Sequence, residues 1–335
     1  MKIFKRGLLI LLIMMVLLCT SLGIYLYVSP MPGVFLLRHA FGGEGEIHNP
    51  PGYEEVQEKV EIQRDLTYPS EDGKNQYDLY LPKEYSGKLP IIVWVHGGAF
   101  VAGDKSGVEN WSTMLAGEGY AVATVNYEWA PEIAYPGQVR QVEECIAELQ
   151  KQADDGLPID MENVIVAGDS AGAHIAAQAG LLASNASYEE ELGVVSRLDA
   201  KNLKGVLLYC GPYNVEKILN VDNKMMQFLA SRIGWAMFGD KHWSEGHMIQ
   251  TTTIKDYITS DYAPAFIADG NTGSFEQEGK ELVQVLEEKG VPTQSLFFDK
   301  SHGEIGHEYQ FDLTTLEGWE TYTKTLEFLD GILAN

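Results

Sequence analysis

The chain has few cysteines and few basic side chains, and each of these shortages excludes a kind of site or a kind of partner. Only three cysteines, Cys19, Cys145 and Cys210, occur among its 335 residues, which excludes a disulfide framework and leaves no metal-binding pattern. Lysine and arginine number 24 against 48 acidic residues, so the formal net charge is −24. Because such a surface repels nucleic acid and anionic lipid headgroups, we expect no nucleic-acid partner.

Internal repeats and low-complexity tracts are also missing. Hydrophobic residues make up 45% of the chain, which is enough for one large core or two modest ones. The composition therefore indicates a globular chain rather than a disordered one.

The N-terminus carries an uncharged run long enough to cross a bilayer. Residues 1–6 include three basic side chains, and the next 22 residues, Gly7 to Val28, contain no charge. As a helix this run would span a membrane, and the basic flank would stay in the cytoplasm. We expect a single-pass anchor in the cell membrane, with the rest of the chain outside the cell.

A cleaved signal peptide is the alternative, and it would make the protein secreted. Its apolar region is usually about 7 to 15 residues long and precedes a small-x-small cleavage site, and neither condition is met well here. Residues 30–59 would then form a stalk, or an arm lying on the domain. Their stretch "VFLLRHAF" (34–41) is too apolar for a free linker, so we expect it to pack.

From residue 60 to the C-terminus, strand and helix patterns alternate. Two runs separated by a turn, "VEIQRDLTY" and "QYDLYLP", predict a pair of edge strands. The later strand candidates, most of them continuously apolar as in strands buried on both faces, are "LPIIVWVHGG", "YAVATVNYEW", "NVIVAGDS", "LKGVLLYCG", "APAFIADG" and "TQSLFFDK". The helix candidates are "QVRQVEECIAELQKQAD", "AGAHIAAQAGLLASN", "EQEGKELVQVLEEKG" and "EGWETYTKTLEFLDGIL". This alternation predicts an α/β fold with a doubly wound, mostly parallel sheet.

One interval, residues 212–262, breaks this rhythm because it is long, helical and rich in methionine and tryptophan. We expect it to form a helical lid inserted into the domain. Its apolar side chains would cover a cleft, although ordinary core packing would equally account for them. They are Met225, Met226, Phe228, Trp235, Met237, Phe238 and Trp243.

The pentapeptide "GDSAG", residues 168–172, joins a predicted strand to a predicted helix. In this context G-x-S-x-G is a nucleophile elbow, which holds a serine at the tip of a sharp, strained turn. Side chains two positions either side of Ser170 would collide, so Gly168 and Gly172 stand there. The helix that follows directs its free N–H groups toward a developing oxyanion. The pattern predicts Ser170 as a catalytic nucleophile.

The stretch "WVHGGAFVAGD" (94–104) places two glycines directly after a strand. The backbone N–H groups of Gly97 and Gly98 are unshielded there and can point into a cleft. Together with the N–H of Ala171 they would form an oxyanion hole. Without the serine motif downstream, the same glycines would indicate only an ordinary turn.

Three stretches in this order, "HGGAF", "NYEWAPE" (126–132) and "GDSAGA", resemble the α/β-hydrolases related to hormone-sensitive lipase. That group includes bacterial carboxylesterases and acetyl-ester deacylases. The resemblance covers about residues 60 to 330. It implies an α/β-hydrolase fold with a catalytic serine, acid and histidine, in that order along the chain.

The base is therefore expected after the last strand, where two histidines, His302 and His307, are found. The stretch "GHEYQF" (306–311) resembles the family's Gly-His-Gly-Phe, which favours His307. His174, one helical turn beyond Ser170, is better explained as packing or holding a loop.

The acid departs from the family's pattern. The family has an aspartate after its seventh strand, in a pattern like Asp-Pro-Leu-x-Asp-Glu-Gly, and alignment at Glu278 places Gly273 at that position. Asp269 ends the predicted strand, and Glu276 lies one helical turn beyond the gap with a longer reach. Either carboxylate could complete the triad, and an acid from elsewhere, or none, is the remaining alternative.

The resemblance implies a serine carboxylesterase that hydrolyses short-chain, acetyl-like esters through a covalent acyl-serine intermediate. No metal or organic cofactor is implied, and the partner is a small ester, for example an acylated saccharide. The membrane would be contacted through the N-terminal helix alone. A peptidase or amidase would use the same site, and a non-catalytic surface binding module would keep the fold while losing its acid.

Overall fold

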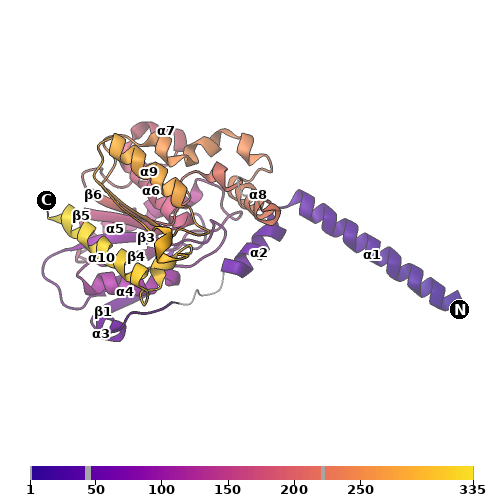
Figure 1. Cartoon of the computed structure of the whole chain (residues 1–335), viewed down its shortest axis with the longest axis horizontal. Helices are drawn as coiled ribbons and strands as arrows, with labels where there is room; N and C mark the ends of the chain where they lie inside the picture. The colour runs from indigo at the N-terminus through magenta and orange to yellow at the C-terminus, as the bar shows by residue number, and fades with distance from the viewer. Residues whose placement is uncertain (1, 42–46, 220–222, 335) are drawn as a thin grey trace.

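Eight strands form one sheet with helices on both of its faces (Figure 1). The computed structural model describes residues 2–41, 47–219 and 223–334, so parts of the predicted stalk (42–46) and lid (220–222) lie outside the described residues. The strands are β1 (Val60–Thr67), β2 (Gln76–Pro82), β3 (Leu89–Val95), β4 (Ala121–Val125), β5 (Ile159–Asp169), β6 (Leu203–Tyr209), β7 (Ala265–Asp269) and β8 (Thr293–Phe297). The α-helices are α1 (Lys2–Val28), α2 (Met31–Phe41), α3 (Tyr53–Gln57), α4 (Glu109–Gly117), α5 (Gly137–Asp154), α6 (Ala171–Ser184), α7 (Ala186–Leu192), α8 (Lys224–Phe238), α9 (Glu276–Glu288) and α10 (Leu316–Leu333).

The strand order is β1-β2-β4-β3-β5-β6-β7-β8. Only the pairings of β1 with β2 and of β2 with β4 are antiparallel, so the predicted doubly wound, mostly parallel sheet is confirmed. β2 lies between β1 and β4 in the sheet. The chain runs from β2 to β3 and then to β4, and β4 pairs with β2 on one side and with β3 on the other. The predicted edge pair therefore supplies one edge strand rather than two.

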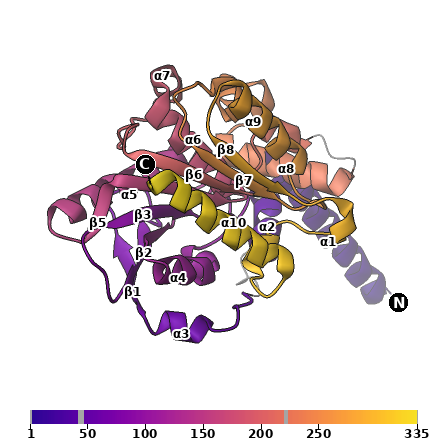
Figure 2. The same cartoon turned by 60° about the vertical axis from the view of Figure 1, so that its left-hand side comes forward.

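Two apolar cores cover the two faces of the sheet. The residues of β3 alternate between them: Ile91, Val93 and Val95 face the core formed with α5, α6 and α9, while Ile92 and Trp94 face the core formed with α4 and α10. Figure 2 shows α10 crossing in front of β6 and β7, with α9 beyond them. Because every side chain of β4 and β7 is also buried, these strands read as continuous apolar runs in the sequence.

The described part of the interval predicted as a lid contains α8 and four short 3₁₀ helices, η2 (Val215–Leu219), η3 (Trp243–Glu245), η4 (His247–Thr252) and η5 (Ile254–Tyr257). Met237 and Trp243 are buried in the core beside the sheet, whereas Met225 and Met226 at the start of α8 are exposed. Core packing thus accounts for the first two side chains, as the alternative interpretation expected.

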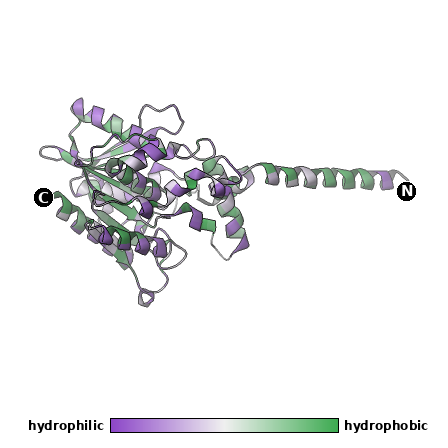
Figure 3. Cartoon of the chain, turned by 90° about the horizontal axis from the view of Figure 1, so that it is seen from above, coloured by the Kyte–Doolittle hydropathy of each residue, from purple (hydrophilic) through white to green (hydrophobic). Residues whose placement is uncertain are grey.

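The N-terminal helix α1 projects away from the domain (Figure 3). Among the described residues, it is the one helix long and apolar enough to cross a membrane, with a mean hydropathy of 2.7 over an 18-residue window of Phe4–Val28 and none of that window buried. A signal sequence near an N-terminus would pass the same test of length and composition.

The segment after α1 lies on the domain. α2 packs against α8, and Val34 is buried between them and the core. The guanidinium of Arg38 donates through Nε to the carbonyl of Val101 at 2.8 Å and through Nη2 to the carbonyl of Ala130 at 3.1 Å. Arg38 also pairs with Glu132. The apolar stretch 34–41 is therefore held against the loop that follows β3.

Candidate active site

Ser170 occupies a strained turn between β5 and α6. Its backbone φ is 50° and ψ is −120°, a region that side-chain-bearing residues avoid and that costs about 1–3 kcal/mol. A methyl group at Gly168 would lie 2.3 Å from the carbonyl oxygen of Gly172, and one at Gly172 would lie 2.0 Å from that of Val95. The backbone packing therefore requires both glycines of the pentapeptide.

His307 lies against Ser170. The chain returns from β8 through η6 (Lys300–His302) to a loop that carries His307, and Nε2 of this ring is 2.9 Å from Ser170 Oγ. Burial lowers the pKa of His307 to about 4, so the imidazole is neutral near pH 7 and Nε2 can accept a proton. The alternative base, His302, lies 3.3 Å from Glu317 Oε1.

The loop after β3 has an unusual backbone conformation. Gly98, Ala99 and Phe100 have φ values of 117°, 54° and 63°. A side chain at Gly98 would collide with the carbonyl of Ala102, 2.2 Å from an added methyl group. Glycine is thus required at this point, where the loop turns beside Ser170.

The two predicted glycine donors of this loop differ in their hydrogen bonding. The N–H of Gly97 donates to Asp169 Oδ2 at 2.7 Å, so it is engaged, contrary to the expectation that it points into a cleft. The Asp169 carboxylate is held in turn by Trp94, whose Nε1 donates to Oδ1 at 2.8 Å. The N–H of Ala171 belongs to the first residue of α6 and has no acceptor within its own helix. Gly98 and Ala171 are therefore the candidate oxyanion donors that remain.

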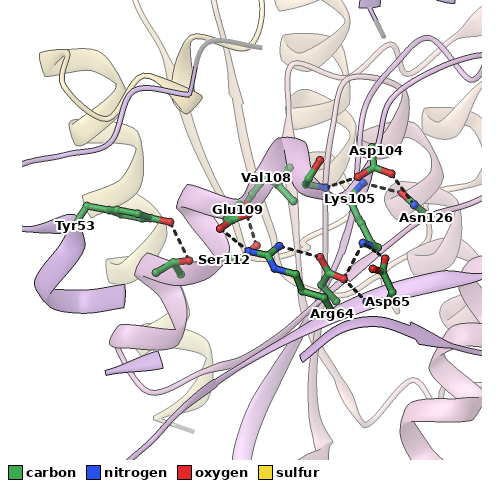
Figure 4. Close-up of polar contacts among 12 residues, drawn as sticks. Tyr53, Arg64, Asp65, Asp104, Lys105, Val108, Glu109, Ser112 and Asn126 are labelled. Atoms are coloured by element: carbon green, nitrogen blue, oxygen red, sulfur yellow. Dashed lines mark hydrogen bonds and ion pairs between the residues drawn. The ribbon is translucent and has the colours of Figure 1, made fainter. Parts of the chain in front are cut away.

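A polar network fixes the far end of the same loop (Figure 4). Asn126 Oδ1 accepts the backbone N–H of Lys105 at 2.7 Å, and Asn126 Nδ2 donates to Asp104 Oδ2 at 2.8 Å. The ammonium of Lys105 pairs with Asp78, which is fully buried on β2, at 2.8 Å, and with Asp65 at 2.9 Å. The loop is therefore pinned to the sheet on both sides of its strained residues.

The two candidate acids occupy very different surroundings. Glu276, at the start of α9, pairs with Lys280 one turn along the same helix. Asp269, at the end of β7, is 1% exposed, and its Oδ1 accepts a hydrogen bond from the Ser274 hydroxyl. Ser274 Oγ is also 2.8 Å from Nδ1 of His307. Asp269 is thus linked to the histidine through one intervening hydroxyl group.

A cysteine lies close to this pair. Among the described residues, the one set of cysteine, histidine and acidic side chains near enough to hold a metal ion is Cys210, Asp269 and His307, whose ligand atoms lie within 4.8 Å of one another. Ser274 already bridges Asp269 and His307 there. The thiol of Cys210 contacts Gln310 Oε1 at 3.4 Å. These contacts fit a hydrogen-bonded site without a metal ion.

A further carboxyl group, Glu308, lies beside Gly97 and His307. A methyl group added to Gly97 would lie 2.7 Å from Glu308 Oε1 and 2.6 Å from Asp169 Oδ2, so both carboxyl groups flank this glycine. Glu308 Oε1 is also 4.0 Å from Nε2 of His307. Burial and the nearby charge of Asp169 raise the pKa of Glu308 well above its usual range, so Glu308 carries the proton of this pair.

One protein-family model matches the sequence of this chain. The family model described as BD-FAE matches residues 77–277, which is more than half of the chain and includes the glycine loop, Ser170 and both candidate acids. The chain belongs to the BD-FAE family. His307 and Glu308 lie beyond the matched residues.

Curated relatives of this BD-FAE protein include hydrolases of several kinds. The esterase LipC of Mycobacterium tuberculosis is 30% identical over 125 residues, which cover 36% of this chain and 30% of LipC. The probable carboxylesterase 6 of Arabidopsis thaliana is 32% identical over 173 residues, covering 47% of this chain and 48% of the relative. Kynurenine formamidase of Danio rerio is 24% identical over 246 residues, covering 72% and 74%. The chain spans less than half the length of the first two.

Solved structures similar to this BD-FAE protein extend over nearly the whole chain. Esterase B of Lactobacillus rhamnosis has a TM-score of 0.72 at 23% identity, covering 83% of this chain and 87% of the esterase. A truncated carbohydrate esterase from gut microbiota has a TM-score of 0.67 at 18% identity, covering 88% and 100%. At such low identity the likeness shows the fold, and the predicted α/β-hydrolase class is confirmed.

The structure of the BD-FAE protein adds residues that the sequence argument missed. Asp169 stands inside the quoted pentapeptide, yet its bonds to Trp94 and Gly97 join positions more than seventy residues apart. Ser274 lies next to Gly273, where the family's aspartate was expected. Ser274 was the feature of the sequence that could have indicated this contact, because a hydroxyl group beside the missing carboxylate can still reach the histidine.

Proposed function

We propose that the protein is a serine esterase that hydrolyses carboxylic esters through an acyl group on Ser170. The observation that carries the proposal is the 2.9 Å contact between Ser170 Oγ and Nε2 of His307 at the strained start of α6. A nucleophile within hydrogen-bond reach of a neutral base is the arrangement that acyl transfer needs. Esterase names among the relatives and structural neighbours support the same reaction.

The steps follow from this geometry. His307 takes the proton of the Ser170 hydroxyl as the oxygen attacks the ester carbonyl. The N–H groups of Gly98 and Ala171 donate to the oxyanion that forms. His307 then gives its proton to the departing alcohol, and afterwards takes one from the water that releases the acid. Each step uses a group that the fold already holds in place.

For the third member of the triad we propose Asp269 rather than Glu276. Asp269→Asn should lower kcat by about 10²- to 10³-fold, because a neutral amide no longer stabilises the imidazolium that forms on His307. Glu276→Gln should change kcat by less than about two-fold, because an exposed ion pair contributes little. Steady-state hydrolysis of p-nitrophenyl acetate by the two variants, side by side, distinguishes the two candidates. A larger loss with Glu276→Gln would reverse the assignment.

We further propose short acyl chains as the preferred substrates. A structural neighbour, esterase B, has been solved with a C4-C4 tributyrin phosphonate inhibitor, and another neighbour is a carbohydrate esterase. The tributyrin phosphonate supports a small acyl group, and the carbohydrate esterase supports an acylated saccharide as the ester. The helical interval 212–262 would serve as the lid, with α1 as a membrane anchor that places the domain outside the cell. Removal of α1 as a signal sequence is the other possibility for the N-terminus.

The test uses the full chain in detergent and p-nitrophenyl acetate, butyrate and octanoate. We expect kcat/KM for acetate and butyrate to exceed that for octanoate by about ten-fold or more, because one methylene misfitting a pocket costs about 1–3 kcal/mol. An alkyl fluorophosphonate should label the protein at Ser170, as located by peptide mass spectrometry. Labelling elsewhere, or faster hydrolysis of octanoate, would contradict the nucleophile or the chain-length preference respectively.

Amide hydrolysis at the same site is a second candidate function. Kynurenine formamidase covers the largest share of this chain among the relatives reported above. Formanilide and phenyl formate differ only in the leaving atom, so their kcat/KM ratio separates the two activities. A non-catalytic binding module is disfavoured by the contact between Ser170 and His307.

A further inference from the structure

The carboxylate and the imidazole of the proposed triad are separated by a serine. Ser274 Oγ lies 2.8 Å from Nδ1 of His307, and the same hydroxyl donates to Oδ1 of Asp269. Among the described residues no direct hydrogen bond joins Asp269 to His307. The side chains therefore form a hydrogen-bond chain of four members, in the order Ser170, His307, Ser274 and Asp269.

The protons of this chain can be assigned in one consistent direction. For His307 to act as a base, Nε2 must carry a lone pair toward Ser170, so the ring proton sits on Nδ1. Nδ1–H then donates to Ser274 Oγ, and the single hydroxyl proton of Ser274 donates to Asp269. A hydroxyl group can accept and donate at the same time, so no member of the chain lacks a partner.

We propose that Ser274 is a positioning residue that connects Asp269 to His307, in place of a direct carboxylate-imidazole hydrogen bond. The proposal rests on the esterase function proposed above. Through its hydroxyl, the ionised Asp269 would keep His307 in the tautomer that accepts the proton of Ser170.

The backbone around Ser274 is fixed closely enough for this role. A methyl group at Gly270 would lie 2.2 Å from the carbonyl oxygen of Gly306, so the loops after β7 and β8 are in direct backbone contact. The N–H of Thr272 donates to the carbonyl of Ile305 at 3.0 Å, and the N–H of Ile305 donates to Asn271 Oδ1 at 3.0 Å. The two loops thus hold Ser274 and His307 at a set separation.

The acid end of this hydrogen-bond chain is shielded from water. Asp269 is 1% exposed, and Phe275 presents its ring edgewise to His307 with 5.5 Å between ring centroids. Because Asp269 is buried, its charge acts on the Ser274 hydroxyl in a medium of lower dielectric constant than bulk water. An isolated carboxylate one hydroxyl away can therefore still bias the imidazole.

The donor-to-acceptor direction of this hydrogen-bond chain depends on whether Asp269 is ionised. Burial raises the pKa of Asp269 to about 7. When Asp269 is protonated it donates to Ser274 Oγ, and Ser274 then donates to Nδ1 of His307. The ring proton is left on Nε2, where it blocks acceptance from Ser170. Activity should therefore rise as the pH increases through about 7, because ionised Asp269 restores the productive direction.

The other ionisable groups facing Asp269 do not disturb this titration. They are Cys210 at the end of β6, Tyr213, Tyr309 and His307. Burial raises the pKa of the Cys210 thiol and of both phenols well above their usual ranges, so all three are neutral near pH 7. Burial likewise keeps His307 neutral there. Among these groups, the charge that changes near pH 7 is that of Asp269. Asp169 and Glu308 form a second titrating pair beside His307, with Glu308 Oε1 4.0 Å from Nε2, because burial raises the pKa of both carboxyl groups.

The test combines Ser274→Ala, the conservative Ser274→Thr, Asp269→Asn and the double variant Ser274→Ala with Asp269→Asn. We expect Ser274→Ala to lower kcat for p-nitrophenyl acetate by about 10²-fold with little change in KM, and Ser274→Thr to restore most of the loss. The kcat of the double variant should be no lower than that of the slower single variant, because both substitutions break the same link between Asp269 and His307. Ser274→Ala should also lose the rise in kcat/KM through pH 7.

Three results would overturn the proposal: an unchanged kcat in Ser274→Ala, losses that multiply in the double variant, or a pH profile that keeps its rise. Ser301→Ala, on the neighbouring loop, is the control and should match the native enzyme. Equilibrium urea denaturation shows whether Ser274→Ala is folded. If it is not, Ser274→Cys takes its place, because a thiol is a poor hydrogen-bond donor and acceptor. Activity that survives Ser170→Ala would instead refute the esterase mechanism itself, so the two failures are distinguishable.

Discussion

Ser170→Ala should abolish ester hydrolysis, with kcat falling by about 10⁴- to 10⁶-fold. In the proposed mechanism, this variant loses the oxygen that forms the acyl-enzyme and keeps the proposed oxyanion donors and base. A small residual rate over water is still expected, because Gly98 and Ala171 can polarise the bound ester without a nucleophile. The measurement is steady-state turnover of p-nitrophenyl acetate, corrected for spontaneous hydrolysis.

Ser184→Ala is the matched control. Ser184 lies at the other end of the same helix, α6, where its hydroxyl donates to the carbonyl of Gly180 at 2.7 Å. We expect this variant to keep native turnover. Native turnover in Ser170→Ala, beside an unaffected control, would exclude Ser170 as the nucleophile.

Gly172→Ala should have the second largest effect, on folding rather than on turnover. The added methyl group would lie 2.0 Å from the carbonyl oxygen of Val95 and 2.5 Å from that of His96. Val95 lies on β3, which is bonded to β4 and β5 on its two sides, so the carbonyl cannot retreat without disturbing the centre of the sheet. We expect a loss of more than about 4 kcal/mol in the free energy of unfolding, as for severe overpacking.

Equilibrium urea denaturation of both proteins measures this loss. Gly107→Ala is the control, because an added methyl group there meets nothing within 4 Å. Its stability should stay within about 1 kcal/mol of the native protein. If Gly172→Ala were as stable as the control, the close approach between α6 and β3 would not exist in solution.

The sequence predicted the parts of the site that short motifs carry. Ser170 is flanked by its two glycines within five residues, and the histidine loop resembles a family pattern of four. Both motifs can be recognised from a few consecutive residues, because the residues that define each motif are adjacent in the sequence. The strands of the central sheet were equally readable, since burial on both faces leaves continuous apolar runs.

What could not be predicted depends on contacts between distant segments. The N–H of Gly97 was expected to be free, yet it bonds the Asp169 side chain, because β3 and β5 are neighbours in the sheet. Ser274 reaches His307 only because the loops after β7 and β8 touch. Helix α4 was also absent from the prediction, since its buried face includes Asn110, Ser112 and Thr113 and lacks a clear apolar period.

The attachment of α2 has a mechanical consequence. Arg38 donates hydrogen bonds to the carbonyls of Val101 and Ala130. These residues lie in the loops after β3 and β4 rather than in the sheet. If α1 is the membrane anchor proposed above, a pull along it would reach the loop beside Ser170 through Arg38 and through the packing of α2 on α8.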